Sequence, residues 1–314
     1  MELIDFSNCV DDIELFDGKA GAKKSIVYED EKWILKFGKT TKSMKDVKIS
    51  YTTSPICEYI GSHIYSMLGL PVHNTKLGVY KTFSKNANSI KDYLVVACKN
   101  FKTNKDDKFY SFLEVLNNFD PDTNDVDNDK LDLETTLLLL KNNKSINEKE
   151  ILERFWQMFV VDALINNNDR HLGNFGVIEN NGNFTLAPIY DNGAAFYNKI
   201  DAEKAEDILQ DKNRYIQSFY HSRVSTYSNN GTNINPYKFI ESMNNETCNK
   251  AVLEIYPKIN VDLVNKLIDD IPEEYEGLSL LPKSIKEFYK ESFRYGVEEV
   301  LKPVYDRLLE SKGE

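Results

Sequence analysis

Three side chains between residues 166 and 193 have the types and spacing that phosphoryl transfer requires. Asp169 precedes Asn174 by five residues, and Asp191 begins an Asp-Asn-Gly turn further along the chain. Carboxylate and amide oxygens are ligands that Mg²⁺ takes in proteins, and another carboxylate can accept the proton of an attacking hydroxyl. We therefore interpret Asn174 and Asp191 as metal ligands and Asp169 as the catalytic base of a small kinase.

A predicted β-hairpin should bring these side chains together. Residues 175–178 have the pattern of a first strand, 179–183 that of a turn and 184–190 that of a second strand. Because a hairpin returns the chain to its start, Asn174 and Asp191 should become neighbours. A helix predicted over 151–165 from its i, i+3, i+4 apolar spacing leads into the site and should give it a buried support.

Lys36 lies in an otherwise apolar predicted strand at 32–37. A lysine in that position is either at a frayed edge or reaching an anion, and the strand alone does not decide between them. Glu58 lies in the first turn of a helix predicted to have Ser54 as its N-cap and to end at Gly69. The helix dipole favours an acid there in any case, and the functional interpretation is that Glu58 holds Lys36.

A glycine- and lysine-containing loop precedes the first predicted strand. Its members Gly18, Gly21, Lys23 and Lys24 are expected to lie over the nucleotide phosphates, where backbone N–H groups and lysines provide a positive field. Lys36 would then hold the α- and β-phosphates. The cofactors expected for this chemistry are ATP and Mg²⁺.

The remaining pattern predicts an α+β, bilobal, protein-kinase-like fold. Strand-like runs at 26–28, 32–37, 77–80 and 93–97 surround the one helix and predict a small antiparallel sheet with an αC-type helix, the N-lobe at 1–97. Residues 98–314 should form a mainly helical C-lobe with the catalytic loop and the hairpin. Within it, a long loop with short helical pieces is expected up to about 237, followed by helices near 236–243, 247–255, 261–269, 282–296 and 297–311.

Several charged features have structural interpretations. Lysines at 39, 42, 45 and 48 recur every third residue and predict a solvated helical face rather than a nucleic-acid patch. The acidic run at 120–125 lacks the glycine and the glutamate of a calcium loop, which favours a surface loop. His171 is interpreted as a structural hydrogen-bonding residue, and Arg170 as a local ion-pair partner.

Composition restricts the class of protein. The chain has 314 residues, is 41% hydrophobic and carries a net charge of −11, so broad binding to nucleic acid is not expected. No apolar run is long enough for a membrane span, and no Sec-type signal peptide is visible. Four widely spaced cysteines indicate free thiols. We expect a cytoplasmic protein, with export by a signal-independent route as the alternative.

Taken in order, these motifs resemble those of HipA-like serine/threonine kinases. Residues 168–174 and the Asp-Asn-Gly turn look like the family's catalytic and metal-binding motifs, 33–36 its nucleotide-lysine strand, 57–59 its αC-type glutamate and 21–25 its phosphate loop. The resemblance implies an ATP- and Mg²⁺-dependent protein kinase that phosphorylates serine or threonine of a protein substrate and autophosphorylates. Ala97 and Cys98, at the expected lobe boundary, join the nucleotide-binding set.

The chain departs from full toxins of this family in three respects. Gly173 replaces the lysine that the family frequently has between the histidine and the asparagine. The loop serine that such toxins autophosphorylate aligns with Ala20, so that switch does not carry over, and Ser25 and Ser43 are the nearby candidates. The extra N-terminal subdomain that docks an antitoxin is not recognisable, so no antitoxin partner is expected. A compact HipA-like kinase of this kind resembles the secreted, cell-translocating, pro-inflammatory kinases of bacterial pathogens.

Two other functions remain open at this point. An Asp-Arg-His-x-x-Asn run also occurs in phosphoinositide kinases, so a lipid or small-molecule kinase is the first alternative. A pseudokinase that binds nucleotide and signals through its helical lobe is the second. Phosphorylation of a serine peptide rather than a lipid would decide against the first, and nucleotide binding without phosphoryl transfer would favour the second.

Overall fold

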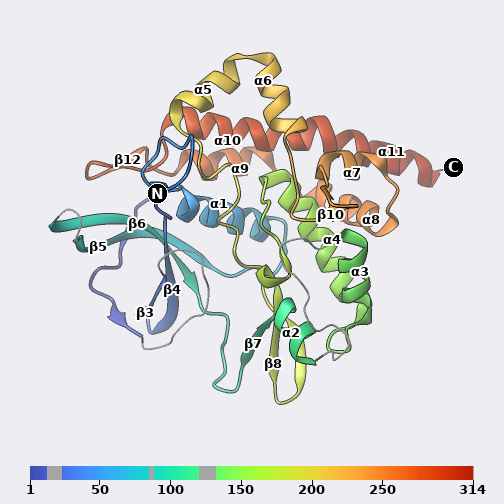
Figure 1. Ribbon diagram of the computed structural model, residues 1–314, viewed down its shortest axis with the longest axis horizontal. Coiled ribbons are helices and arrows are strands. Elements are labelled where there is room, and N and C mark those ends of the chain that lie inside the picture. Colours follow the sequence, from blue (N-terminus) through green and yellow to red (C-terminus); the bar gives the residue numbers. More distant parts are fainter. Residues whose placement is uncertain (13–22, 85–87, 120–131, 314) are drawn as a thin grey trace.

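The computed structural model describes residues 1–12, 23–84, 88–119 and 132–313. Figure 1 shows a twisted sheet with helix α1 (Ser54–Met67) behind it and a larger, mainly helical region beside it. This mixed architecture confirms the predicted α+β class. Gly18, Gly21 and the acidic run at 120–125 lie outside the described residues.

The six-stranded sheet has the order β1-β5-β6-β4-β3-β2 and is antiparallel except where β1 pairs with β5. Its strands are β1 (Ile4–Asp5), β2 (Val10–Asp11), β3 (Lys23–Tyr28), β4 (Glu31–Phe37), β5 (Thr75–Ser84) and β6 (Ser89–Lys99). Glu29 and Asp30 have φ of 53° and 59°, as the two-residue turn between β3 and β4 requires. The β3–β4 register sets Lys23 opposite Lys36, so both lie on one face of the sheet.

Alternation along β4 and β6 divides their side chains between two faces. Leu35 and Ala97 are paired, and both are buried in a small outer cluster. Val96 is paired with Lys36 and lies on the other face, in the main core to which α1 contributes. Lys36 therefore projects from the face of the sheet that packs on the helix.

Helix α1 begins one residue earlier than predicted. Thr53 is its N-cap and makes no side-chain capping bond, while Ser54 is already helical and its Oγ lies 2.9 Å from Oγ1 of Thr52. Ile56 and Ile60 are fully buried, which is the apolar stripe expected of an amphipathic helix. Gly69 follows with φ of 72° and ends the helix as predicted.

The segment 38–53, between β4 and α1, contains no helix, so the predicted helical face is wrong. Its backbone pairs with itself instead: the Thr41 amide donates to the Ser50 carbonyl at 3.1 Å, and the Thr52 amide donates to the Lys39 carbonyl at 2.9 Å. These bonds use groups that a helix would need for its own ladder. The lysines are solvated as expected, but on an irregular loop.

Helix α4 (Glu148–Ile165) is the buried helix that the apolar spacing predicts, extended by a turn at its start. The side chain of Asn147 caps it by accepting from the amides of Lys149 and Glu150. Asn166, with φ of 53°, ends it in the left-handed conformation that asparagine tolerates.

The predicted C-terminal helices are all present. They are α7 (Pro236–Ser242), α8 (Glu246–Ile255), α9 (Val261–Asp269), α10 (Lys283–Tyr295) and α11 (Lys302–Gly313), with the π-helix η5 (Gly296–Leu301) joining the last two. The expected long loop after residue 193 is more helical than predicted, because it holds α5 (Ala202–Gln210), α6 (Lys212–Ile216) and the π-helix η3 (Gln217–His221).

Other elements were not predicted from the sequence. They are α2 (Phe112–Phe119), η4 (Tyr256–Lys258) and two small hairpins, β10 (Ser228–Asn229) with β11 (Thr232–Asn233) and β12 (Glu274–Tyr275) with β13 (Leu278–Ser279). Helix α3 (Leu133–Asn142) contains the short apolar run at 137–140 that the sequence indicates as helical, and extends it on both sides. Within the described ranges, no helix is both long and apolar enough to cross a membrane.

The predicted hairpin after the catalytic loop exists, but its second strand is shorter. β8 (Gly176–Asn180) pairs with β9 (Asn183–Leu186), and an unpredicted strand β7 (Lys108–Ser111) pairs on the other side of β8. Ile189 leaves the hairpin because its amide donates to the Pro71 carbonyl and its carbonyl accepts from the His73 amide. The chain that leads to Asp191 is thereby tied to the segment that follows α1.

Candidate active site

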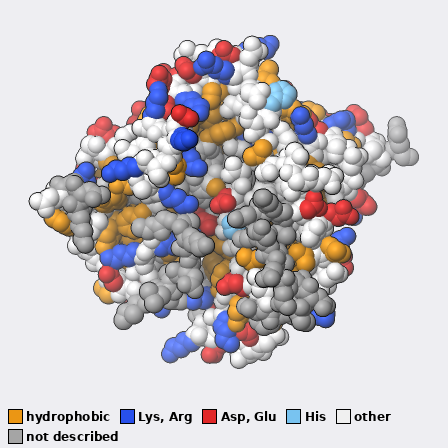
Figure 2. Space-filling view, in the orientation of Figure 1, with side chains coloured by type: hydrophobic (Ala, Val, Ile, Leu, Met, Phe, Trp, Pro, Cys, Tyr) orange, Lys and Arg blue, Asp and Glu red, His pale blue; other side chains and the backbone are white. Residues whose placement is uncertain are grey.

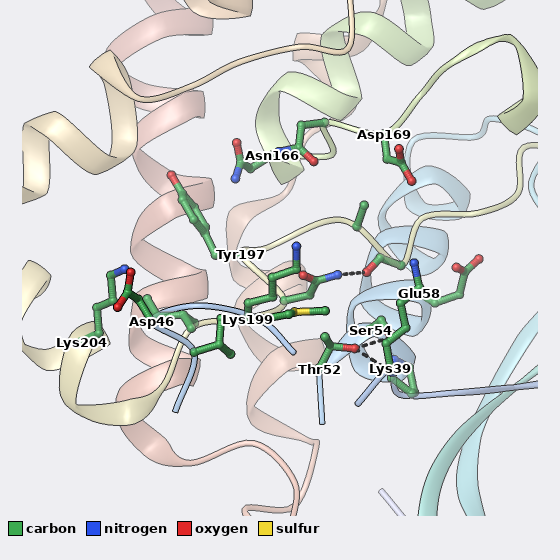
Figure 3. Close-up of a pocket in the computed structure, with 18 of the residues that line it drawn as sticks. Lys39, Asp46, Thr52, Ser54, Glu58, Asn166, Asp169, Tyr197, Lys199 and Lys204 are labelled. Atoms are coloured by element: carbon green, nitrogen blue, oxygen red, sulfur yellow. Dashed lines mark hydrogen bonds between the residues drawn. The ribbon is translucent and has the colours of Figure 1, made fainter. Parts of the chain in front are cut away.

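A cleft of about 1020 Å³ is lined by residues of both the sheet and the helical region. Four of the predicted site residues line it: Lys36, Glu58, Asp169 and Asp191. Figure 3 shows Glu58 and Asp169 toward one end, Lys204 and Asp46 at the other, and Tyr197 and Lys199 between them.

Lys36 joins two carboxylates that are far apart in the sequence. Its Nζ lies 3.1 Å from Oε2 of Glu58 and 3.0 Å from Oδ1 of Asp191. Burial alone would lower the pKa of Lys36, but the charges of Asp191 and Glu58 outweigh burial and hold that pKa well above its usual value. Lys36 is therefore protonated and positively charged. The interpretation of Lys36 as a lysine at a frayed strand edge is excluded, because it pairs with two carboxylates.

Glu58 is almost fully buried, with only 1% of its side chain exposed. Burial would raise its pKa, but Lys36 and His73 more than offset this and lower the pKa below its usual value. Nε2 of His73 lies 2.9 Å from Oε1 of Glu58 and 3.2 Å from Oγ of Ser62. Oε2 is paired with Lys36, whereas Oε1 lies at ion-pair distance from His73 and makes no hydrogen bond with a described residue. Lys36 is therefore the main group that keeps the glutamate charged inside the protein.

Gly193 allows the turn after Asp191 to approach α1. A Cβ at this position would lie 3.2 Å from Oε2 of Glu58 and 3.4 Å from the carbonyl oxygen of Ser54. Asp191 itself has φ of 61°, a conformation that costs energy in a residue other than glycine. The charge of Lys36 is the main cause that lowers the pKa of Asp191, so its carboxylate is ionised at neutral pH.

Asp169 and Asn174 are joined by the backbone of the catalytic loop. The Asn174 side-chain amide donates to the Asp169 carbonyl at 2.6 Å, and the short 3₁₀-helix η2 (Leu172–Asn174) holds Asn174 in place. The Asp169 carboxylate faces the cleft and is 56% exposed. The surrounding protein nevertheless raises its pKa through partial desolvation, an effect that the neighbouring His171 opposes.

Arg170 organises the loop from behind. Its guanidinium pairs with Asp162 of α4, with Nε 2.9 Å from Oδ2, and Nη1 donates to the carbonyls of both Asn174 and Tyr190. One cation therefore holds both ends of the hairpin. This supports the predicted approach of residues 174 and 191 and confirms Arg170 as a local ion-pair partner.

The same guanidinium reaches α1 through a chain of hydrogen bonds. Nη2 of Arg170 donates to Asn192, whose side-chain amide donates to Oγ of Ser62 at 3.0 Å. Ser62 lies against His73, and His73 against Glu58. All five side chains are buried, so this polar chain is rigid and links the catalytic loop to the lysine–glutamate pair.

The remaining predicted nucleotide-binding residues divide between the two faces of the sheet. Lys23 shares the face of Lys36, and its charge contributes to the lowered pKa of Asp191. Lys24 points to the other face, where its Nζ lies 2.8 Å from Asp11 and contacts Tyr80. The period of two along β3 therefore sets only one of the two lysines on the face of Lys36, and neither lysine is part of the cleft lining.

Ala97 and Cys98 are not brought to the cleft. Ala97 is buried in the outer cluster, and both residues pair with β4 and β5, so the two ladders use their backbones. Cys98 is buried, and its sulfur lies within 4.8 Å of ligand atoms of Glu58 and His73. Because Lys36 already pairs with that glutamate, this group forms a polar core rather than a cation site.

The donor chemistry of Asp191 and Asn174 fits a hard divalent cation. Both offer oxygen, and the Asn174 amide nitrogen is engaged by the Asp169 carbonyl, so its oxygen is the atom left to act as an acceptor. No ligand of soft character belongs to this pair, which favours Mg²⁺ over zinc.

Three functional neighbours were missed by reasoning from the sequence. They are His73, Asn192 and Asp162. Asp162 carried a usable signal, because it is an acid on the apolar face of the helix 151–165 and a buried acid needs a cation. His73 and Asn192 carried none, since only the packing of α1 against the turn after Asp191 brings them into the site.

Comparison with known proteins agrees with this geometry. The model of the HipA-like C-terminal domain family matches residues 18–255. The serine/threonine-protein kinase CtkA of Helicobacter pylori is 33% identical over 284 residues, which cover 87% of this chain and 80% of CtkA.

Solved structures give the same result. The crystal structure of the Helicobacter pylori proinflammatory kinase CtkA matches with a TM-score of 0.85 at 29% identity, and all of each chain is covered. HipA of Shewanella oneidensis, solved with HipB and operator DNA, matches with a TM-score of 0.51 at 14% identity over 94% of this chain and 69% of HipA. That second likeness concerns the fold alone.

Proposed function

This chain belongs to the HipA-like family and is a serine/threonine-protein kinase, and from that premise we propose how its cleft transfers the γ-phosphoryl group of ATP. The observation that carries the proposal is the pairing of Lys36 with both Glu58 and Asp191, three residues that line the same cleft as Asp169. Family and activity are those that the sequence motifs predicted.

Lys36 binds the α- and β-phosphates, and Lys23 on the same face adds positive charge. Glu58, fixed by His73, keeps the lysine in position, so the cation does not have to be organised when nucleotide arrives. Mg²⁺, held by Asn174 and Asp191, neutralises phosphate charge when it is bound.

Asp169 orients the acceptor hydroxyl and takes its proton. Its carboxylate is exposed to the cleft and accepts no hydrogen bond shorter than 3.5 Å from the side chains of the described residues, and His171 lies no closer than 3.9 Å. A base with free lone pairs beside the phosphate site is what in-line attack requires. Acceptor specificity for serine or threonine comes from the family.

The two-lobe division is also part of the proposal. We place the boundary at the end of β6 rather than at residue 97, because β6 runs to Lys99 and the division predicted at 97 and 98 would cut the strand. The N-lobe then contains the six-stranded sheet and α1, and the C-lobe contains the catalytic loop and the hairpin.

The test is Mg²⁺-dependent transfer from γ-labelled ATP to a protein acceptor or to the chain itself. Wild type should be labelled on serine or threonine, and Asp169→Ala should lose roughly 10²–10⁴-fold in rate while it still binds nucleotide. Asp306→Ala removes an exposed carboxylate of α11 and is the matched control. Equal rates in wild type and Asp169→Ala would reject the base.

Only one of the two serines suggested as autophosphorylation sites is accessible. Ser25 is 6% exposed and its Oγ donates to Asp12, so a second kinase molecule cannot reach it in the folded protein. Ser43 is exposed on the segment 38–53. Phosphosite mapping of the labelled wild type should find Ser43 and not Ser25.

The description of CtkA as a proinflammatory kinase motivates a further part of the proposal, that this chain acts on cells of a host. Purified wild type added to cultured macrophages should raise cytokine release, and Asp169→Ala should not. An equal response to both proteins would separate the effect from kinase activity.

A further inference from the structure

The cleft continues well beyond the residues assigned to phosphoryl transfer. Its outer part lies between the segment 38–53 on one side and residues 194–222 on the other. The second of these walls directly follows Gly193, so it begins where the metal-binding turn ends. Asp169 lines the same cleft, so an acceptor placed at Asp169 adjoins this part.

Unpaired positive charge dominates the outer cleft. Four lysines line it, and none makes an ion pair with a described residue; we call them the lysine wall: Lys39, Lys45, Lys199 and Lys204. Arg214 also lines the cleft, but its guanidinium is paired with Asp207 at 3.0 Å. That pairing leaves Asp46 as the one unpaired acid on the described outer lining, against four lysines, in a chain whose net charge is −11.

The lysine wall extends from the catalytic base to the far end of the cleft. Lys39 lies close enough to Asp169 for its charge to lower the pKa of that carboxyl. Figure 3 places Lys199 midway and Lys204 at the end opposite Glu58. Figure 2 shows Lys and Arg side chains over α5 and α6 with acidic side chains among them, and further Lys and Arg side chains between these helices and the N-terminal sheet.

From this arrangement we propose that the lysine wall binds acidic residues flanking the acceptor serine or threonine, so the preferred substrate is an acidic segment of a protein. The inference rests on the proposed function, because it uses Asp169 to locate the acceptor. Binding of the nucleotide does not explain why four unpaired lysines line the outer cleft. Lys36, Lys23 and the metal ligands already serve the phosphates at the other end, whereas Lys199 and Lys204 lie on the wall after Gly193.

Electrostatic complementarity of this kind sets partner choice more than it sets tight affinity. All four lysines are exposed, and a single solvated pair contributes little. Several pairs acting together should therefore give a preference of roughly tenfold, and salt should weaken it because exposed charges are screened.

The test uses two pools of degenerate peptides with a fixed central serine, one with Asp and Glu and the other with Lys and Arg at the flanking positions. Wild type should phosphorylate the acidic pool about tenfold more efficiently at low salt. The double substitution Lys199→Glu/Lys204→Glu should abolish or invert this ratio and leave the KM for ATP unchanged. Lys141→Glu/Lys258→Glu, on the exposed surface away from the cleft, is the matched control and should keep the wild-type ratio.

Several results would overturn the proposal. For wild type, they are equal rates on the two pools or phosphorylation of neither pool. For Lys199→Glu/Lys204→Glu, they are an unchanged ratio of rates or a raised KM for ATP. The raised KM would show that the lysine wall binds the nucleotide rather than the substrate. The catalytic assignment is judged separately by the absolute rate of Asp169→Ala on the same peptides. If Asp169→Ala loses activity but wild type shows no preference for the acidic pool, Asp169 remains the catalytic base and the proposed role of the lysine wall in substrate binding is rejected.

Discussion

His73 and Lys36 lie beside opposite oxygens of the Glu58 carboxylate: Nε2 of His73 lies 2.9 Å from Oε1, and Nζ of Lys36 lies 3.1 Å from Oε2. The lysine–glutamate pair is thus one end of a longer buried chain. Through Ser62 and Asn192 that chain continues to Arg170, which also holds the ends of the catalytic hairpin.

Replacing His73 by alanine should lower kcat roughly tenfold, because Glu58 loses the partner that fixes its second oxygen and the position of Lys36 becomes less defined. His73→Gln, whose amide can still donate toward Glu58, should recover part of the loss. Steady-state kinetics with saturating ATP measure both variants. His221→Ala, an exposed histidine, is the control, and an unchanged kcat in His73→Ala would show that Lys36 alone positions Glu58.

Lys36→Met should abolish transfer and also reduce stability in a pH-dependent way. It leaves Glu58 and Asp191 without their shared cation, a loss of about 3 kcal/mol near neutral pH for a largely buried pair. The pKa values of both carboxylates are lowered by Lys36, so this stability is fully present above their ordinary pKa values and is lost as pH falls through the lowered ones. Urea unfolding at pH 7 and pH 4 should show a smaller difference between wild type and Lys36→Met at pH 4. A constant difference would mean that the lysine does not set those pKa values.

Removing Asp162 should destabilise the protein far more than removing a surface acid. Asp162→Ala leaves the buried guanidinium of Arg170 without its carboxylate, and loss of one partner of a buried pair costs about 3–5 kcal/mol. Asp207→Ala removes an exposed partner of Arg214 and should cost less than about 1 kcal/mol. Urea midpoints of the two variants give the comparison, and similar values would show that other groups support Arg170.

The pH dependence of activity should report on Asp169. Its pKa is raised, mainly by desolvation, so the base loses its charge and the rate falls as pH drops through a value above its ordinary 3.8. Lys39 is one of the charges that lower this pKa. Lys39→Met should therefore shift the acid limb of the kcat profile to higher pH at saturating peptide. A shift to lower pH would exclude Asp169 as the group that titrates.

Much of the site was predictable because its residues lie in local patterns. The apolar spacing of 151–165 and the hairpin that follows depend on nearby residues, so α4, β8 and the approach of Asn174 to Asp191 could be read from the chain. The same holds for Lys36, which stands out as a charge in an apolar strand.

Local patterns failed where backbone groups found partners farther along the chain than the local pattern assumed. The second hairpin strand was predicted to reach Tyr190, but Ile189 pairs with residues 71 and 73 instead. The lysine-rich segment 38–53 has helical spacing, yet Thr41 and Ser50 pair across it. In both places a hydrogen bond to a distant residue replaced the local one that the pattern assumed.

What the sequence determined by itself was the family and the kinase activity of this protein, from a recognisable order of motifs that contain Lys36, Glu58 and Asp169. Only the tertiary structure decided which side chains reach the cleft. Lys23 and Lys24 are adjacent in the sequence, but the pleat of β3 turns one toward Lys36 and the other toward Asp11. Likewise, the docking of α1 against the turn after Asp191 aligned His73 with Glu58, because buried polar groups must find partners wherever packing places them.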